Sequence, residues 1–422
     1  MKRSLCTIIK CVLLFALLPN LLISQCLTGG RYYDKLFQVK SNLNIQYGTG
    51  LTFNATYQDL YMNVYEPLND TLTPQRPLIV LAFGGSFTSG FKTSPDIVRL
   101  CNEFTQRGYV TCAIDYRLGF ENGNDSDTNQ FKALIRGVQD MKAAVRYFYK
   151  DAQTAKTYRV DTNKIFIGGV SAGAFIALNY AYGRLDTLSF PAPGFALPAL
   201  LSLGGPEGDS GNPGYSSKVS GVIDLCGAIA DTVWIMPSAP PLCGVHGTND
   251  SLVACQFDSA HAAQTVESRL FGGCDIVHRL QHINTSSSFH IFQGAGHVPF
   301  VLPSGPSTPP SSYYMDTTIW VIRDFLYRQV CYQALAVEAV KEGLSISVYP
   351  NPSSDFVNFS SQQNSPLQLE IFGVDGRLMA QNSIEANETI TLSKQQIGAG
   401  VYIYKLTDSN LGTNKVGRLV FY

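Results

Sequence analysis

Charge of either sign is scarce in this sequence of 422 residues: 31 Lys and Arg stand against 32 Asp and Glu, and all four types make up 15% of the chain. Without a basic excess, the chain lacks the electrostatic footprint of a nucleic-acid-binding protein, so no nucleic-acid partner is expected. There is no acidic run that would form a solvating tail. No Cys-x-x-Cys pair occurs, and we expect neither a metal nor a cofactor. Hydrophobic residues make up 45% of the chain, which is enough for a large core in two or three domains.

Long apolar runs are also few, and the one at the N-terminus has the features of a targeting segment. Basic residues within the first ten positions precede an apolar run from Cys11 to Ile23, which is too short to span a bilayer comfortably. We predict a secretory signal peptide over residues 1–25. The alternatives are an N-terminal anchor, including a lipid on Cys26, or a buried helix. No later segment is expected to cross a membrane, so no stable membrane span is predicted.

Eight cysteines remain after the predicted signal peptide. An even number in an exported chain suggests disulfide bonds, and buried free thiols are the alternative. Cys101 could join Cys112, and a bond between Cys243 and Cys255 would stiffen the segment between them. The eight residues are Cys26, Cys101, Cys112, Cys226, Cys243, Cys255, Cys274 and Cys331.

Between residues 57 and 332, short apolar runs of the buried-strand type alternate with stretches in which apolar residues have helical spacing. This alternation predicts an α/β fold with a doubly wound, mostly parallel sheet. The predicted strands are 57–65, 78–83, 109–115, 164–168, 219–226, 242–246 and 289–292. The predicted helices are 97–107, 130–151, 174–181, 260–271 and 317–332.

Composition divides the rest of the chain. Residues 183–218 are rich in Pro and Gly, and we predict an insertion over the sheet that is either a lid or pocket wall, or a plain surface loop. The pattern changes around residues 332–343, which we interpret as a linker. Residues 344–422 form alternating runs separated by turns, which predicts a separate small all-β sandwich. The first domain would then span residues 26–331.

The most informative motif is Gly169-Val-Ser171-Ala-Gly173. An apolar strand precedes it and a helical stretch follows, which is the context of a nucleophile elbow. The serine of such an elbow sits in a sharp, strained turn, where side chains two residues to either side would clash. We therefore expect Ser171 to be a catalytic nucleophile. That chemistry also requires a base, an acid that orients the base, and an oxyanion hole.

The base and the acid are expected on loops that follow later strands. His297 lies in a glycine-rich turn after the strand 289–292, and Asp250 follows the strand 242–246, so the order along the chain is serine, acid, histidine. Asp224 is an alternative acid, and Asp275 is a less favoured one. The other five histidines lie inside the last strand or before it, some of them on helix-like stretches: His246, His261, His278, His282 and His290.

The oxyanion hole is expected in Phe83-Gly-Gly-Ser86, which follows the first buried parallel strand. Glycines there let the backbone approach a substrate carbonyl closely. The predicted donors are the N–H groups of Gly85, Ser86 and Ala172, the last directly after the nucleophile at a helix N-terminus. The alternative is a plain Gly-Gly turn.

Six ordered motifs resemble those of the carboxylesterase and hormone-sensitive-lipase-like α/β-hydrolases, over about residues 57–331. The resemblance implies a triad of Ser171, Asp250 and His297 that cleaves carboxylic esters through an acyl-enzyme. A serine peptidase of the same fold and a non-catalytic surface-binding protein remain alternatives. The ester accepted stays open, because the sequence departs from the usual pattern at Phe83, Ser86, Val170 and Ala174. The motifs are Phe83-Gly-Gly-Ser-Phe-Thr-Ser-Gly90, Asp115-Tyr-Arg-Leu-Gly119, Asp140-Met-Lys-Ala-Ala-Val-Arg-Tyr147, Gly169-Val-Ser-Ala-Gly173, His246-Gly-Thr-Asn-Asp250 and Gly296-His297.

The last 79 residues contain a second set of motifs. Val348-Tyr-Pro-Asn-Pro-Ser353, Gly373-Val-Asp-Gly-Arg377 and Gly398-Ala-Gly-Val-Tyr402 resemble the type A C-terminal sorting domain of the type IX secretion system. The resemblance implies that the type IX machinery is a partner, that the chain crosses the outer membrane, and that it is released or attached at the cell surface after removal of the domain. A carbohydrate-binding sandwich is the alternative, but this segment has no Trp for an aromatic platform.

Overall fold

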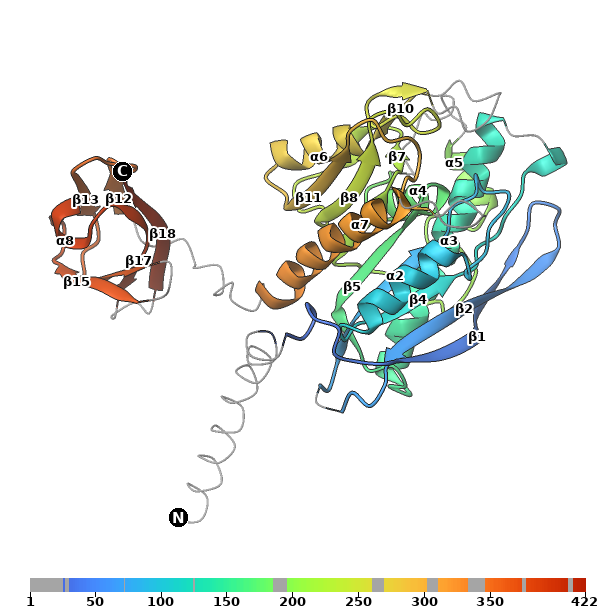
Figure 1. Cartoon of the computed structure of the whole chain (residues 1–422), viewed down its shortest axis with the longest axis horizontal. Helices are drawn as coiled ribbons and strands as arrows, with labels where there is room; N and C mark the ends of the chain where they lie inside the picture. Colours follow the sequence, from blue (N-terminus) through green and yellow to red (C-terminus); the bar gives the residue numbers. More distant parts are fainter. Residues whose placement is uncertain are drawn as a thin grey trace, which may run out of the picture. The chain divides into compact units, whose positions relative to one another are not determined.

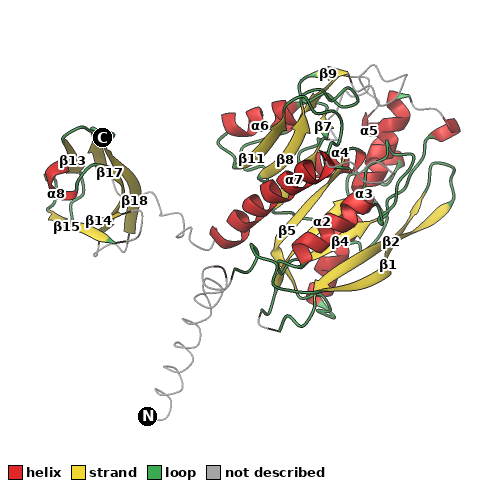
Figure 2. Cartoon of the chain, in the orientation of Figure 1, coloured by secondary structure: helices red, strands yellow, loops and turns green. Residues whose placement is uncertain are grey.

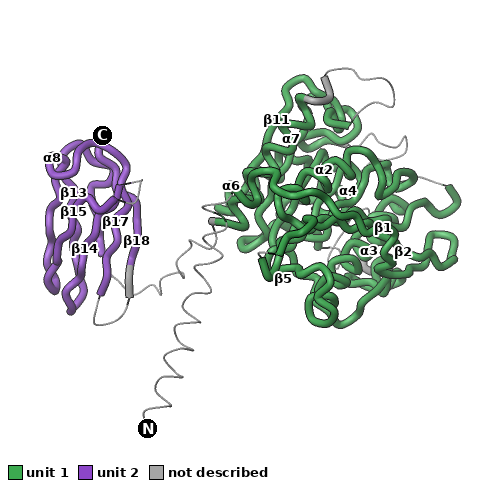
Figure 3. The backbone as a smooth tube through the Cα atoms, turned by 60° about the horizontal axis from the view of Figure 1, so that its bottom comes forward, with its two compact units in different colours: residues 1–333 green, residues 334–422 purple. Residues whose placement is uncertain are grey.

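The computed structural model divides the chain into two compact units, residues 1–333 and 334–422 (Figure 3). It describes residue 26 and residues 30–71, 73–123, 126–184, 196–259, 269–301, 310–332, 346–373, 377–408 and 413–422. The predicted signal peptide lies outside the described residues, and so does the predicted linker apart from Tyr332. Among the described helices, none is long and apolar enough to cross a membrane.

The first unit is built on an eight-stranded sheet (Figures 1 and 2). The six strands from β4 to β11 pair in parallel, whereas β1 and β2 join the edge antiparallel. Strands β3, β4, β6 and β8 are buried at every position, which is why they appear in the sequence as continuous apolar runs. In sheet order the strands are β1 (Val39–Leu51), β2 (Tyr57–Pro67), β4 (Val110–Ile114), β3 (Arg76–Ala82), β5 (Val160–Val170), β6 (Gly221–Leu225), β8 (Leu242–Gly247) and β11 (Ser287–Phe292).

Helices cover this sheet in two layers. Helices α2 (Pro95–Thr105) and α7 (Pro310–Tyr327) contact each other over one face, and α3 (Asp127–Gln153) and α4 (Ala172–Ala181) contact each other over the other (Figure 1). Helix α7 ends in a π-helical turn, Arg328–Tyr332. The predicted doubly wound α/β-hydrolase architecture is confirmed.

The region between β8 and β11 differs from the prediction. A helix was expected over residues 260–271, but Arg269–Gly272 forms the short strand β10, and helix α6 occupies Gly273–His282. Strand β10 pairs antiparallel with β7 (Ala228–Ile229) and β9 (Asp258–Ser259). Residues 260–268 lie outside the described part of the chain. The pair Gly272-Gly273 explains the difference, because glycine interrupts regular structure and allows the chain to turn from strand into helix.

Of the predicted insertion, the structure describes residues 183–184 and 196–218, and the latter contain the short helix α5 (Ala196–Ser202) and a series of turns. This segment is held against α3. Gln139 Nε2 donates to the carbonyl oxygens of Leu203 at 2.8 Å and Gly205 at 2.7 Å, and Arg146 Nε donates to Gly211 O at 2.9 Å.

The disulfides are not the pairs that the sequence suggested. Cys26 bonds to Cys331 and Cys255 bonds to Cys274, whereas the remaining four cysteines of the described chain are buried free thiols, Cys101, Cys112, Cys226 and Cys243. The expected Cys243–Cys255 bond is wrong because Cys243 is the second residue of β8. The strand then carries the chain about 13 Å further before it turns into the loop that holds Cys255. The expected Cys101–Cys112 bond is wrong because Cys112 Sγ points instead to Met62 Sδ on β2, at 3.4 Å.

The second unit is the predicted all-β sandwich. One sheet has the order β12 (Ile346–Tyr349), β13 (Phe356–Ser361), β16 (Thr389–Ser393), and the other has the order β15 (Leu378–Ile384), β14 (Leu367–Gly373), β17 (Gly400–Asp408), β18 (Thr413–Phe421). A one-turn helix, α8 (Lys394–Ile397), follows β16. Alternate residues of the strands, such as Leu369 and Ile371, are fully buried between the two sheets, as the alternating pattern requires.

Candidate active site

Ser171 occupies a strained turn between β5 and α4, with φ 51° and ψ −117°. Such a backbone is costly for a residue with a side chain, and the surrounding packing enforces it. A Cβ on Gly169 would lie 2.4 Å from the carbonyl carbon of Gly173, and a Cβ on Gly173 would lie 2.2 Å from the carbonyl oxygen of Ala82 on β3. The two flanking glycines therefore let the elbow pack against itself and against the neighbouring strand.

The structure brings Ser171, His297 and Asp250 into one hydrogen-bonded chain. His297 Nε2 lies 2.8 Å from Ser171 Oγ, and His297 Nδ1 lies 2.7 Å from Asp250 Oδ2. Each residue follows the carboxyl end of a strand of the same sheet: β5, β8 and β11. The carboxyl ends of parallel strands meet at one edge, which is where ligands bind in open α/β sheets.

Asp250 is held as a carboxylate. Its Oδ1 accepts hydrogen bonds from the backbone N–H groups of Leu252 at 3.0 Å and Val253 at 2.9 Å. Burial alone would raise the pKa of Asp250, but the hydrogen bonds to His246 and His297 outweigh it and keep that pKa well below the usual range. The negative charge therefore persists beside His297 Nδ1.

The rival acids are placed elsewhere. Asp224 lies inside β6, fully buried, where its Oδ1 accepts from the N–H of Gly227 at 2.8 Å. Burial raises the pKa of Asp224 to about 6. Asp275 lies in the first turn of α6, where burial raises its pKa. Neither carboxylate is hydrogen-bonded to His297 in the described structure.

The glycine-rich loop after β3 lies against the elbow. A Cβ on Gly84 would lie 3.2 Å from Ser171 Cβ, and Ser86 and Phe87 both have positive φ, 51° and 62°. The carbonyl oxygen of Gly85 accepts from the N–H groups of Thr88 and Ser89, which closes the turn. In the described part of the chain, no backbone acceptor outside the regular helices and strands is found for the N–H groups of Gly85, Ser86 and Ala172, the predicted donors.

Tyr116 supports this loop, a role that the sequence did not predict. Its buried hydroxyl donates to the carbonyl oxygen of Phe83 at 3.0 Å, and its ring stacks on the Phe83 ring with centroids 4.4 Å apart. Phe83 is one of the positions at which the sequence departs from the motifs it resembles. Packing against Tyr116 gives that aromatic ring a structural function.

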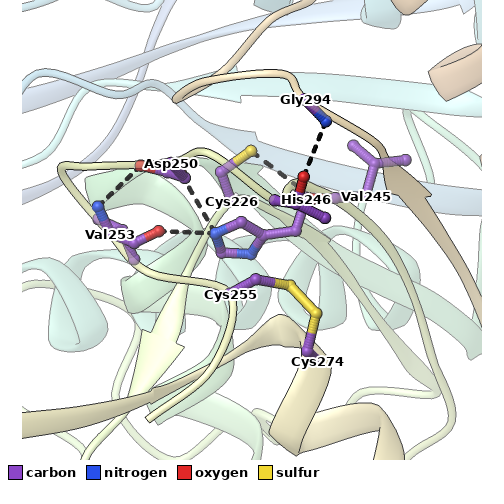
Figure 4. Close-up of a disulfide and its surroundings, with 9 residues drawn as sticks. Cys226, Val245, His246, Asp250, Val253, Cys255, Cys274 and Gly294 are labelled. Carbon is purple, nitrogen blue, oxygen red and sulfur yellow. Dashed lines mark hydrogen bonds and ion pairs between the residues drawn. A yellow bond between two sulfur atoms is a disulfide. The ribbon is translucent and has the colours of Figure 1, made fainter. Parts of the chain in front are cut away.

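His246 is the second residue that the sequence analysis missed. It lies in β8 below Asp250, with the Cys255–Cys274 disulfide on the other side of its ring (Figure 4). Its Nε2 lies 3.2 Å from Asp250 Oδ2 and 2.8 Å from the carbonyl oxygen of Val253. The four-residue spacing from Asp250 was visible in the sequence, but nothing there showed that the imidazole would turn toward the carboxylate.

Two segments of the chain match protein-family models. Residues 62–195 match the model named BD-FAE, and residues 347–420 match the model described as a secretion system C-terminal sorting domain. The chain thus contains an esterase-like α/β-hydrolase domain followed by a type IX sorting domain. The sorting domain directs the chain to export through the type IX system, to the cell surface or into the medium.

Individual relatives were also found. Venom carboxylesterase-6 of Apis mellifera is 30% identical over 125 residues, which is 29% of this chain and 20% of the bee protein, so the match spans about a fifth of that relative. Among solved structures, native esterase Est2 of Thermogutta terrifontis is 21% identical, with a TM-score of 0.47, over 72% of this chain and 95% of that one. Its propionate-bound form is 21% identical with a TM-score of 0.46, over 70% and 96%.

Proposed function

We propose that the protein is an exported serine hydrolase that cleaves carboxylic esters through an acyl-enzyme, with Ser171 as nucleophile, His297 as base and Asp250 as the acid that orients it. The observation that carries this proposal is the unbroken hydrogen-bonded chain from Ser171 Oγ through both nitrogens of His297 to Asp250. A nucleophile, a base and an orienting group within hydrogen-bond reach are the signature of an activated serine.

The geometry supports the following sequence of steps. His297 Nε2 takes the proton of Ser171 Oγ as this oxygen attacks the ester carbonyl carbon. The resulting oxyanion accepts hydrogen bonds from the N–H groups of Gly85, Ser86 and Ala172, and one such donor contributes about 3 kcal/mol of transition-state stabilisation. The imidazolium then gives its proton to the departing alcohol, which leaves Ser171 acylated. A water molecule, activated by the same His297, releases the carboxylic acid and restores the serine.

Asp250 has an electrostatic function in this scheme. Its carboxylate accepts a hydrogen bond from His297 Nδ1–H, which leaves the lone pair of Nε2 facing Ser171 Oγ. It also stabilises the imidazolium that forms during the attack. Because the pKa of Asp250 is held low, its carboxylate stays charged beside His297 Nδ1.

The test is to replace Ser171 by Ala and to measure hydrolysis of a short p-nitrophenyl ester by the full chain. We expect turnover to fall to the background rate, while Ser360→Ala, in the C-terminal unit, leaves it unchanged. An organophosphonate should modify the wild type once per chain, at Ser171, and should leave Ser171→Ala unmodified. Retained esterase activity in Ser171→Ala would refute the proposal. Absence of labelling would indicate a non-catalytic protein, and preferential cleavage of aminoacyl amides would indicate a peptidase.

A further inference from the structure

The imidazole of His246 has an environment that the steps above do not use. The residue is fully buried in β8, and its Nε2 faces two oxygen atoms: the carbonyl of Val253 at 2.8 Å and Asp250 Oδ2 at 3.2 Å. Asp250 Oδ2 is the same oxygen that accepts from His297 Nδ1. His246 and His297 therefore converge on one carboxylate oxygen, and Figure 4 shows the His246 side of this arrangement.

The protonation of His246 follows from these partners. A backbone carbonyl and an ionised carboxylate are both acceptors only, so Nε2 must carry the proton and donate it to them. An unprotonated Nε2 would place its lone pair against two oxygen lone pairs in a site without solvent, which is strongly unfavourable. The tautomer of His246 is thus set by the loop that carries Asp250.

The opposite nitrogen, Nδ1, has no hydrogen-bond partner among the described residues. A Cβ on Gly273, at the start of α6, would lie only 3.0 Å from it, so the ring is enclosed on this side. Burial works to lower the pKa of His246, but Asp250 and the nearby charge of Asp224 on β6 outweigh it, and the pKa is raised.

The other groups near the ring add no charge. The Cys226 thiol, after β6, lies within 4.8 Å of a ring nitrogen of His246 and a carboxylate oxygen of Asp250. Burial raises the pKa of this thiol far above its usual value, so it stays neutral. Cys274, in the first turn of α6, is held in the disulfide with Cys255 and does not titrate. The charges that act on the ring are thus those of Asp250 and Asp224, and both favour keeping a proton on His246.

We propose that His246 is a positioning residue for the reaction proposed above. Its Nε2–H group holds Asp250 Oδ2 and the Val253 carbonyl oxygen in place. The same hydrogen bond offsets part of the negative charge of the carboxylate that would otherwise act on His297. This inference rests on the assignment of Asp250 as the acid. It adds a second histidine behind the triad, one that does not touch the substrate.

Two amide substitutions separate the two nitrogens of the ring. In His246→Gln the side-chain amide nitrogen can occupy the place of Nε2, whereas in His246→Asn it occupies the place of Nδ1. We expect His246→Gln to retain most of the kcat for a p-nitrophenyl ester, and we expect His246→Asn and His246→Leu to lose about 10- to 100-fold in kcat with little change in KM, since small misplacements of catalytic groups have effects of this size. His278→Asn, on the exposed side of α6, is the matched histidine-to-asparagine control and should behave as the wild type.

A pH profile distinguishes positioning from a general loss of structure. Without the His246 donor, the full charge of Asp250 acts on His297, so the acid limb of kcat/KM should move upward by roughly 0.5–1 pH unit in His246→Asn and His246→Leu, and should stay in place in His246→Gln. Equal impairment of the Gln and Asn variants would overturn the proposal. So would a loss of activity that follows the loss of folded protein with no shift of the profile.

A measurement on the unsubstituted full chain covers the case in which the variants do not fold. In protein labelled with ¹⁵N-histidine, a slowly exchanging ring proton on Nε2 of His246 is expected at neutral pH, and an unprotonated Nε2 would refute the proposal. Failure of the proposed function itself is recognised separately. In that case Ser171→Ala stays active or Ser171 is not labelled, whatever the His246 variants do.

Discussion

The two disulfides constrain different parts of the first unit. Removing Cys26–Cys331 should mainly lower the free energy of unfolding, and removing Cys255–Cys274 should mainly lower kcat. Cys26–Cys331 closes 305 residues of sequence and joins the start of the described chain to the π-helical turn after α7, where Tyr327 Oη also donates to the carbonyl oxygen of Cys26 at 2.8 Å. For a loop of this length the chain-entropy relation gives about 6 kcal/mol. Cys255–Cys274 closes only 19 residues, which gives about 3 kcal/mol.

Their effects on catalysis should have the opposite order. The long-range disulfide lies far along the chain from every proposed catalytic residue, so the Cys26→Ser, Cys331→Ser double variant should keep its kcat while it is folded. Cys255 lies five residues after Asp250, and its bond to the first turn of α6 fixes the end of the loop on which Asp250 and Val253 lie. The Cys255→Ser, Cys274→Ser double variant should therefore lose about tenfold in kcat despite its smaller loss of stability.

Urea unfolding followed by tryptophan fluorescence measures the stability of the first unit, which contains both disulfides. Both tryptophans of the chain, Trp234 and Trp320, lie in the first unit, so the signal does not report on the sandwich. The kcat is measured on the same samples without urea. The reasoning is refuted if loss of Cys26–Cys331 leaves the urea midpoint unchanged, or if that variant loses kcat while the Cys255, Cys274 variant keeps it.

Two further substitutions test the support of the proposed oxyanion loop and the buried carboxyl group of Asp224 on β6. Tyr116→Phe removes the hydroxyl that donates to the carbonyl oxygen of Phe83, so kcat should fall about tenfold at unchanged KM. Tyr109→Phe is the control, because the Tyr109 hydroxyl is buried with no hydrogen-bond partner among the described residues, and an equal loss of kcat there would contradict the interpretation. Asp224→Asn should stabilise the protein increasingly as pH rises. Burial raises the pKa of Asp224 to about 6, so the folded state holds this proton more tightly than the unfolded chain, and the wild type loses roughly 3 kcal/mol between about pH 4 and pH 6. Urea midpoints of both proteins at pH 4.5 and 7.5 should diverge in favour of the variant, and a difference that does not depend on pH would exclude this origin.

The parallel part of the sheet could be predicted from the sequence because burial on both faces leaves a direct trace, a continuous apolar run such as β3 or β8. Ser171, Asp250 and His297 could be nominated for a related reason: each follows such a run, and the carboxyl ends of parallel strands converge. Strand β1 was not predicted. It lies at the edge of the sheet with most residues exposed or half-exposed, so it is held by backbone hydrogen bonds to β2 that no side-chain pattern records.

The missed residues act through contacts between segments distant in sequence or through a side-chain orientation. The pairing of Cys255 with Cys274 depends on how β10 and α6 return to the loop after β8, which cysteine spacing does not encode. The Tyr116 hydroxyl donates to the carbonyl oxygen of Phe83, 33 residues away in sequence. His246 contacts Asp250 only because its ring turns toward the loop after β8. These contacts become visible only when the elements are assembled.

Backbone strain gathers at the same edge of the sheet as the proposed chemistry. Ser86 follows β3, Ser171 follows β5, Cys226 follows β6 and Val298 follows His297, and all four have positive φ, between 41° and 62°. For a β-branched residue such as Val298 this backbone is a marked departure, and such residues cost of order 1–3 kcal/mol each. None of these turns would persist alone. The turns at Ser86, Ser171 and Cys226 persist because each follows a strand whose carboxyl end is buried, and glycines at 169 and 173 allow the contacts that lock the turn at Ser171. The strands thus hold Ser171 and the proposed oxyanion loop in conformations that the same residues would not adopt in a free loop.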